Sequence, residues 1–197
     1  MMIFLLAAVS IFSRVNGPLL ALGRWTGAAL MGLMVVVILV QVFFRYVLND
    51  ALAWTEELAR FLMLWMVSLM APTAFRHGGF ISIDTLRRFL PDRPAALLNL
   101  ALLLVSAVVL WWAVTIGWSE ATGIGGRFTM PSLMLPTALD LSAWMKVPRS
   151  FMMASLATGV TMMFSVNIEL LLRLLADLFG AGDRLKPLAH AVGLESE

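Results

Sequence analysis

Three long stretches of the sequence contain no formally charged residue: 25–44, 95–119 and 150–168. At a rise of about 1.5 Å per residue, roughly 20 apolar residues of helix cross the hydrocarbon core of a bilayer, which is about 30 Å thick. The chain as a whole is 61% hydrophobic and only 13% charged. These stretches therefore predict membrane-spanning helices and exclude an ordinary soluble domain.

A fourth apolar stretch is too short to span on its own. Residues 61–75 are uncharged and would form only about 22 Å of helix. Either Pro72 and a locally thinned bilayer absorb the deficit, or the helix begins near Trp54 and draws the preceding charges to the membrane edge. We prefer the second interpretation. The expected spans are then about 25–44, 55–75, 95–119 and 150–168.

The predicted fold class is an all-α membrane protein with four transmembrane helices and an N-terminal interfacial amphipathic helix. Within the segment 1–18, residues 1–13 resemble a signal-peptide core but lack a basic start, and Arg14 stands where a small-residue cleavage site would be expected. We expect this segment to lie along the interface and to turn at Asn16-Gly17-Pro18, a loose chain start being the alternative. Residues 1–197 are interpreted as a single membrane domain, with 169–197 as a polar C-terminal tail.

The distribution of Lys and Arg predicts the orientation. Nine of them lie before residue 25, in 76–94 and after 169, against five in the alternating segments 45–60 and 120–149. Because Lys and Arg are enriched in cytoplasmic loops, both termini are expected in the cytoplasm and segment 45–60 on the outer side of a bacterial inner membrane.

The residue inventory narrows the possible chemistry. The chain has no cysteine and only two histidines, His77 and His190, which excludes disulfides, thiolate metal sites and a bis-histidine haem between helices. The predicted span interiors contain no ionisable side chain, whereas pumps and ion-coupled transporters usually place such groups there. We therefore expect no catalytic, metal or cofactor site, and no transport by this chain alone.

The segment 45–60 is the most charged part of the predicted membrane region. Glu56 and Arg60 are i, i+4 neighbours on a helix, and Glu57 would reach Arg60 at i+3. An interfacial aromatic anchor with a self-neutralising ion pair explains most of this pattern. Two alternatives stay open: the excess carboxylate binds a cation, or it docks a second protein. Membrane-embedded catalysis by the two glutamates would need a nucleophile, metal or oxyanion donor that the sequence does not offer.

Two further patterns concern packing. Gly23 with Gly27, and Ala28 with Gly32, have the small-xxx-small spacing that allows helices to approach closely. Segment 120–149 is too long for a plain loop and is rich in apolar residues. We expect it to pack against a partner or the membrane interface.

Several motifs together resemble one family. They are Arg45-Tyr46-Val47-Leu48-Asn49, Trp54-Thr55-Glu56-Glu57-Leu58-Ala59-Arg60, Trp65 within the second span, and the segment from Arg76 to Asp84. In order and spacing they resemble the small membrane subunit (DctQ-like) of tripartite ATP-independent periplasmic (TRAP) transporters, over roughly residues 20 to 175. One departure is Phe80, where relatives often carry a histidine.

The resemblance implies a four-helix inner-membrane subunit that pairs with a large multi-span permease subunit. It also implies a periplasmic substrate-binding protein, an organic-acid substrate and uptake driven by sodium. Substrate and sodium sites are expected on the large subunit, and no nucleic acid is expected as a partner. The structural or partner-interface residues implied for this chain are Arg45, Asn49, Trp54, Thr55, Glu56, Glu57, Arg60, Trp65, Arg76 and Asp84.

Overall fold

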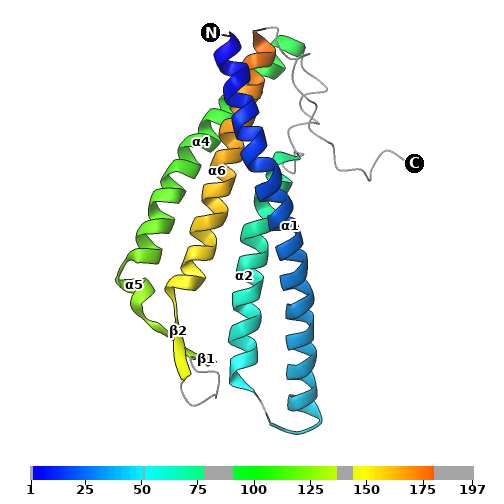
Figure 1. Ribbon diagram of the computed structural model, residues 1–197, viewed down its shortest axis with the longest axis vertical. Helices are drawn as coiled ribbons and strands as arrows, with labels where there is room; N and C mark the ends of the chain where they lie inside the picture. Colours follow the sequence, from blue (N-terminus) through cyan, green and yellow to red (C-terminus); the bar gives the residue numbers. More distant parts are fainter. Residues whose placement is uncertain (1, 51, 78–90, 137–143, 180–197) are drawn as a thin grey trace, which may run out of the picture.

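A bundle of four long helices forms the protein (Figure 1). The computed structural model describes residues 2–50, 52–77, 91–136 and 144–179. All four long helices are long and apolar enough to cross a membrane, which confirms an all-α, multi-pass membrane protein. They are α1 (Met2–Tyr46), α2 (Ala53–Arg76), α4 (Asp92–Thr122) and α6 (Ser150–Leu178).

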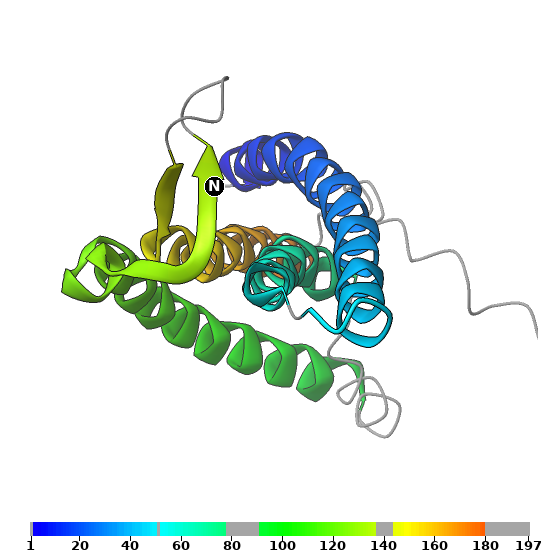
Figure 2. The same ribbon diagram turned by 90° about the horizontal axis from the view of Figure 1, so that it is seen from below.

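Helix α6 lies at the centre of the bundle and packs against α4, α2 and α1. Helix α4 packs mainly on α6, whereas α1 packs on α2 as well, so α4 and α1 form opposite flanks (Figure 2). The outward side of α4 exposes Val108, Trp111 and Trp112, and that of α1 exposes Val36 and Leu39. A membrane protein presents such apolar flanks to lipid or to another subunit.

Helix α1 runs without interruption through the predicted turn at Asn16-Gly17-Pro18, so the expectation of a separate interfacial helix was wrong. Asn16 is 1% exposed, and its side chain bonds to α6. These inward contacts hold the residues in a helix, although Pro18 removes one backbone donor. With 45 residues, α1 is about 68 Å long, about twice what a bilayer core requires.

The other helix boundaries settle two predictions. Helix α2 begins at Ala53, which confirms that the second span starts near Trp54 and includes the charged residues. Helix α6 continues to Leu178, so the expected polar tail from residue 169 was wrong: Glu169 is a buried helical residue. The predicted interfacial piece after Arg76 and the last part of the tail lie outside the described residues.

Glycines bring the helices into close contact at several crossings. A Cβ on Gly23 would lie 2.8 Å from the backbone oxygen of Leu69, and one on Gly27 would lie 2.6 Å from Cγ of Met70. The predicted close helix contact at this pair of glycines is therefore confirmed, on α2. Gly32 has open space around it and makes no such contact.

A two-stranded antiparallel hairpin, which we did not predict, occupies the end of the bundle near the start of α2 (Figure 1). The short helix α5 (Ile124–Arg127) leads into β1 (Thr129–Pro136), which pairs with β2 (Trp144–Pro148). Met130, Leu133 and Val147 are buried against Leu58, Phe61 and Met152. The long connection of the sequence thus packs on α2 and α6 through its own small core.

Candidate functional site

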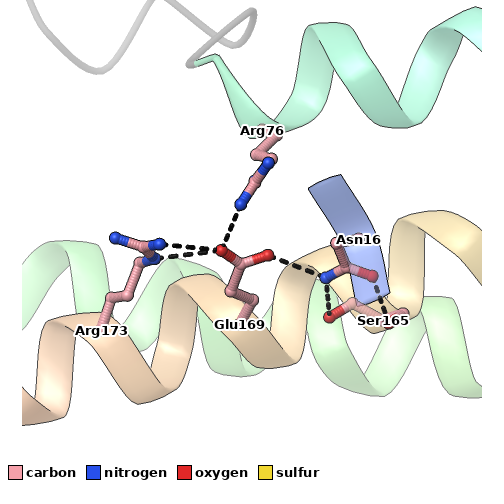
Figure 3. A network of polar contacts seen from close by, with 5 residues as sticks. All are labelled: Asn16, Arg76, Ser165, Glu169 and Arg173. Carbon is pink, nitrogen blue, oxygen red and sulfur yellow. Dashed lines mark hydrogen bonds and ion pairs between the residues drawn. The ribbon is translucent and has the colours of Figure 1, made fainter. Parts of the chain in front are cut away.

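A buried polar network joins three helices (Figure 3). It lies towards the end of α2 and of α6, away from the hairpin (Figure 1). At its centre, Glu169 of α6 is fully buried. Its Oε1 lies 2.6 Å from Nη2 of Arg76 at the end of α2 and 3.1 Å from Arg173 one turn further along α6. Its Oε2 accepts a hydrogen bond of 2.8 Å from Nδ2 of Asn16 in α1, and the Ser165 hydroxyl donates to Oδ1 of Asn16.

These contacts explain how a carboxylate can be buried in so apolar a protein. Taking a charge out of water costs several kcal/mol per ion unless good geometry and further hydrogen bonds compensate. Here Glu169 receives donors from α1, α2 and α6 itself. The network therefore acts as a cross-link that fixes the mutual positions of three helices.

Only one member of this network, Arg76, was among the residues predicted from the sequence. Glu169 was missed because it follows the last uncharged stretch, and Asn16 because it precedes a Gly-Pro pair. One signal was available. Glu169 and Arg173 have i, i+4 spacing, and the other residues of the run 169–176 are apolar. This pattern is typical of a helix that continues past residue 168 and pairs the charge of Glu169 with that of Arg173.

The two adjacent glutamates of α2 have different surroundings. Glu57 turns towards the hairpin, where its Oε2 accepts a hydrogen bond of 2.7 Å from the backbone N–H of Ser132. Glu56 pairs with Arg60 at 3.2 Å on the surface, with side chains 71% and 57% exposed. The Glu56–Arg60 pair is confirmed, whereas the predicted reach of Glu57 to Arg60 is replaced by the bond to the hairpin.

Three more predicted residues shape the connection between α1 and α2. Arg45 is exposed in the last turn of α1. Asn49 has a positive φ of 51°, a backbone conformation that asparagine adopts more readily than most residues. The hydroxyl of Thr55, which is fully buried, donates to the backbone oxygen of Leu52 at 2.7 Å. Of the three, Thr55 makes a contact at the start of α2.

The two predicted tryptophans lie at different depths along α2. Trp54 is 40% exposed at the first turn. Trp65 lies mid-helix with its ring centroid 6.3 Å from that of Phe61, and both line an apolar groove of about 470 Å³ with α1. Asp84 lies outside the described residues. The predicted site residues that the structure describes therefore do not form one site: Arg76 lies at the network end, Trp65 lies mid-helix, and the others lie towards the hairpin end.

Glu57 at one end and Glu169 at the other each serve a contact between elements. In the described ranges, no group of three or more acidic or histidine side chains is placed to hold a metal ion. The chemical role of these carboxylates is to accept hydrogen bonds that hold the helices and the hairpin in fixed positions.

Comparison with known proteins places this geometry in context. Residues 34–177 match the family described as tripartite ATP-independent periplasmic transporters, DctQ component. The chain is 31% identical over 110 residues to the isethionate TRAP transporter permease protein DctMQ of Oleidesulfovibrio alaskensis, covering 51% of this chain and 17% of that protein. It is also 31% identical over 71 residues to a Haemophilus influenzae protein named as a TRAP transporter small permease, covering 36% of this chain and 44% of that protein. The chain thus spans less than half the length of either relative.

Proposed function

Because this chain belongs to the DctQ component family of TRAP transporters, we propose that it works as the small permease subunit beside a large multi-span permease subunit. The relative named DctMQ supports a permease partner, since the matched region is only 17% of that permease protein. The apolar outward flanks of α1 and α4 offer surfaces on which a second membrane subunit can pack.

The observation that carries a scaffold role is the complete pairing of Glu169 with donors from three helices. A part that moves during transport needs contacts that break and form again. This chain instead combines a buried ionic cross-link with helix crossings at Gly23 and Gly159, where no Cβ fits. Such a bundle is suited to be the fixed body against which a partner moves.

The finer features of the proposal rest on the family resemblance and on charge. Uptake is driven by sodium, the substrate is an organic acid, and a soluble periplasmic protein delivers it. The substrate and sodium sites belong to the large subunit. The distribution of Lys and Arg supports an inner-membrane location with both termini in the cytoplasm.

The proposal is tested by purification and uptake together. The tagged chain, extracted in a mild detergent, is expected to co-purify with the large permease subunit. Deletion of the chain should abolish uptake of the organic acid, and a plasmid copy should restore it. Full uptake by the large subunit alone, or substrate turnover by this chain alone, would contradict the scaffold role.

A second test uses Glu57→Ala. If the role is structural, the substitution weakens subunit association or stability and leaves the sodium concentration at half-maximal uptake unchanged. Glu56→Ala is the matched control, because that carboxylate is 71% exposed and pairs with Arg60 on the surface of the same helix. Persisting uptake with an altered sodium dependence after Glu57→Ala would argue for a direct part in coupling.

A further inference from the structure

The hairpin and α5 together expose a group of apolar and basic side chains. We call this surface the hairpin platform. Its apolar members are Ile124, Phe128, Met134 and Met145, which are 77%, 62%, 44% and 53% exposed. Its basic members, all exposed, are Arg127, Lys146 and Arg149. Residues 124–136 and 144–149 carry these three cations and no acidic residue.

The platform is held against the helices. Glu57 accepts the backbone N–H of Ser132, and the backbone N–H of Arg149 donates to the oxygen of Phe128 at 2.7 Å. The inner side chains of the hairpin, Met130 and Val147 among them, are buried on α2 and α6. The exposed apolar residues are therefore presented on a fixed surface and cannot fold inwards to leave water.

The hairpin lies at the end of the bundle where α2 begins (Figure 1). Figure 2 looks along the long helices and shows β1 lengthwise, so β1 runs across the helix axes, whereas β2 also extends along the bundle in Figure 1. Met134 pairs with Lys146 across the two strands, which places an apolar and a cationic side chain next to each other. A surface of this composition at the end of a bundle of spanning helices lies near the zone where headgroups adjoin acyl chains.

Two opposing costs determine the depth of this surface. Four exposed apolar side chains favour leaving water. The outer edge of each strand in a two-stranded sheet carries unpaired backbone groups, and these cannot be satisfied in hydrocarbon. Cations are costly there as well. The apolar side chains leave water, and the backbone groups and cations stay out of hydrocarbon, only at the headgroup layer. Lipid phosphates there also neutralise the three cations.

We propose that the hairpin platform binds phospholipid headgroups, with Arg127, Lys146 and Arg149 on lipid phosphates and the four apolar side chains reaching the acyl boundary. The charge distribution of the chain assigns this contact to the outer leaflet. The inference goes beyond the proposed function, because it involves neither substrate nor the large subunit.

The sequence contains no cysteine, so a single introduced cysteine can be labelled without a background signal. Phe128→Cys, Met134→Cys and Met145→Cys in the full chain are spin-labelled and placed in nanodiscs of phosphatidylethanolamine with phosphatidylglycerol. Collision with oxygen, which concentrates in lipid, is compared with collision with a water-soluble nickel chelate. Val108→Cys on the exposed flank of α4 is the lipid reference, and exposed Asp50→Cys at the same end is the water reference.

The three labels are expected to favour oxygen over nickel nearly as strongly as Val108→Cys. Oxygen-to-nickel ratios equal to that of Asp50→Cys would overturn the proposal. So would nickel protection that arises only when a soluble binding protein is added, because the surface would then belong to that protein.

The electrostatic part has its own test. Combining Arg127→Glu, Lys146→Glu and Arg149→Glu with the label at Met134 should raise nickel accessibility several-fold in discs that contain phosphatidylglycerol. Arg45→Glu, an exposed cation at the same end but outside the platform, should leave it unchanged. If Arg45→Glu raised nickel accessibility as much as the triple substitution, the three platform cations would not be the ones that bind headgroups. A second check leaves the three cations in place and so does not depend on folding of the charge variants. Replacing phosphatidylglycerol with phosphatidylcholine should also raise nickel access at Met134→Cys.

Discussion

At the scale of residues, three glutamates show how location decides the use of a carboxylate. Glu169 is buried with three donors, Glu57 accepts a backbone N–H of the hairpin, and Glu56 forms a surface pair. Exposed ion pairs contribute about 0–1 kcal/mol to stability, whereas the loss of one partner from a buried pair costs about 3–5 kcal/mol. The three positions should therefore respond very differently to substitution.

Glu169→Ala should destabilise the bundle by about 3–5 kcal/mol, because two largely buried guanidinium groups lose their common partner. Glu169→Gln keeps an acceptor but no charge and should lie between alanine and the natural residue. The free energy of unfolding in mixed micelles is the measurement, with Glu56→Ala as the control, expected to change it by less than about 1 kcal/mol. Similar losses for Glu169→Ala and Glu56→Ala would show that the network is not the cross-link described.

Glu57→Ala should loosen the hairpin and leave the long helices intact. Removing the acceptor of the Ser132 N–H leaves that donor without its partner, a cost of about 1–3 kcal/mol. Hydrogen exchange of residues 129–134 should accelerate, while exchange within α6 stays the same. If the hairpin exchanges at the original rate, its own core on Leu58 and Phe61 holds it without Glu57.

At the scale of elements, helix spacing depends on a few glycines. A Cβ on Gly159 of α6 would lie 2.7 Å from the backbone oxygen of Ser68 in α2, so the two helices are in direct backbone contact there. The apolar stretches of the sequence showed that these helices exist, since span length is a local property. Gly23 and Gly27 were predicted to lie at a crossing because of their small-xxx-small spacing, whereas Gly159 was not predicted.

Gly159→Ala should force α6 and α2 apart and cost about 1–3 kcal/mol, the usual range for overpacking. Gly32→Ala is the matched control, because nothing lies within 4 Å of the added carbon and alanine favours a helix over glycine by about 1 kcal/mol. Thermal unfolding in detergent should therefore separate the two variants in opposite directions. A neutral Gly159→Ala would indicate that the crossing tolerates wider spacing.

At the scale of the whole molecule, the network and the hairpin lie at opposite ends of one bundle (Figure 1). With nine Lys and Arg on the side of the termini and five on the other, we expect the network at the cytoplasmic end and the hairpin at the outer end. This orientation would place the hairpin on the side of the proposed periplasmic binding protein.

A membrane-impermeant maleimide should label Asp50→Cys in intact spheroplasts, because that residue is exposed in the connection between α1 and α2. A cysteine placed after residue 197 should react only once the membrane is permeabilised. The chain has no other cysteine to label, so the original chain is the blank. Labelling with the reverse pattern would invert the assigned orientation and move the proposed lipid contact to the inner leaflet.

The fold class, the number of long apolar helices and the family could be predicted from the residues alone, because apolar length and motif spacing are read along the chain. The start of the second helix near Trp54 was predicted correctly as well. The contacts of the polar residues, by contrast, depend on the folded arrangement of the helices. Asn16 and Glu169 are 153 residues apart, and Ser132 and Glu57 are 75 apart. Whether a carboxylate in this chain is exposed or buried depends on such distant donors, and no local pattern specifies them.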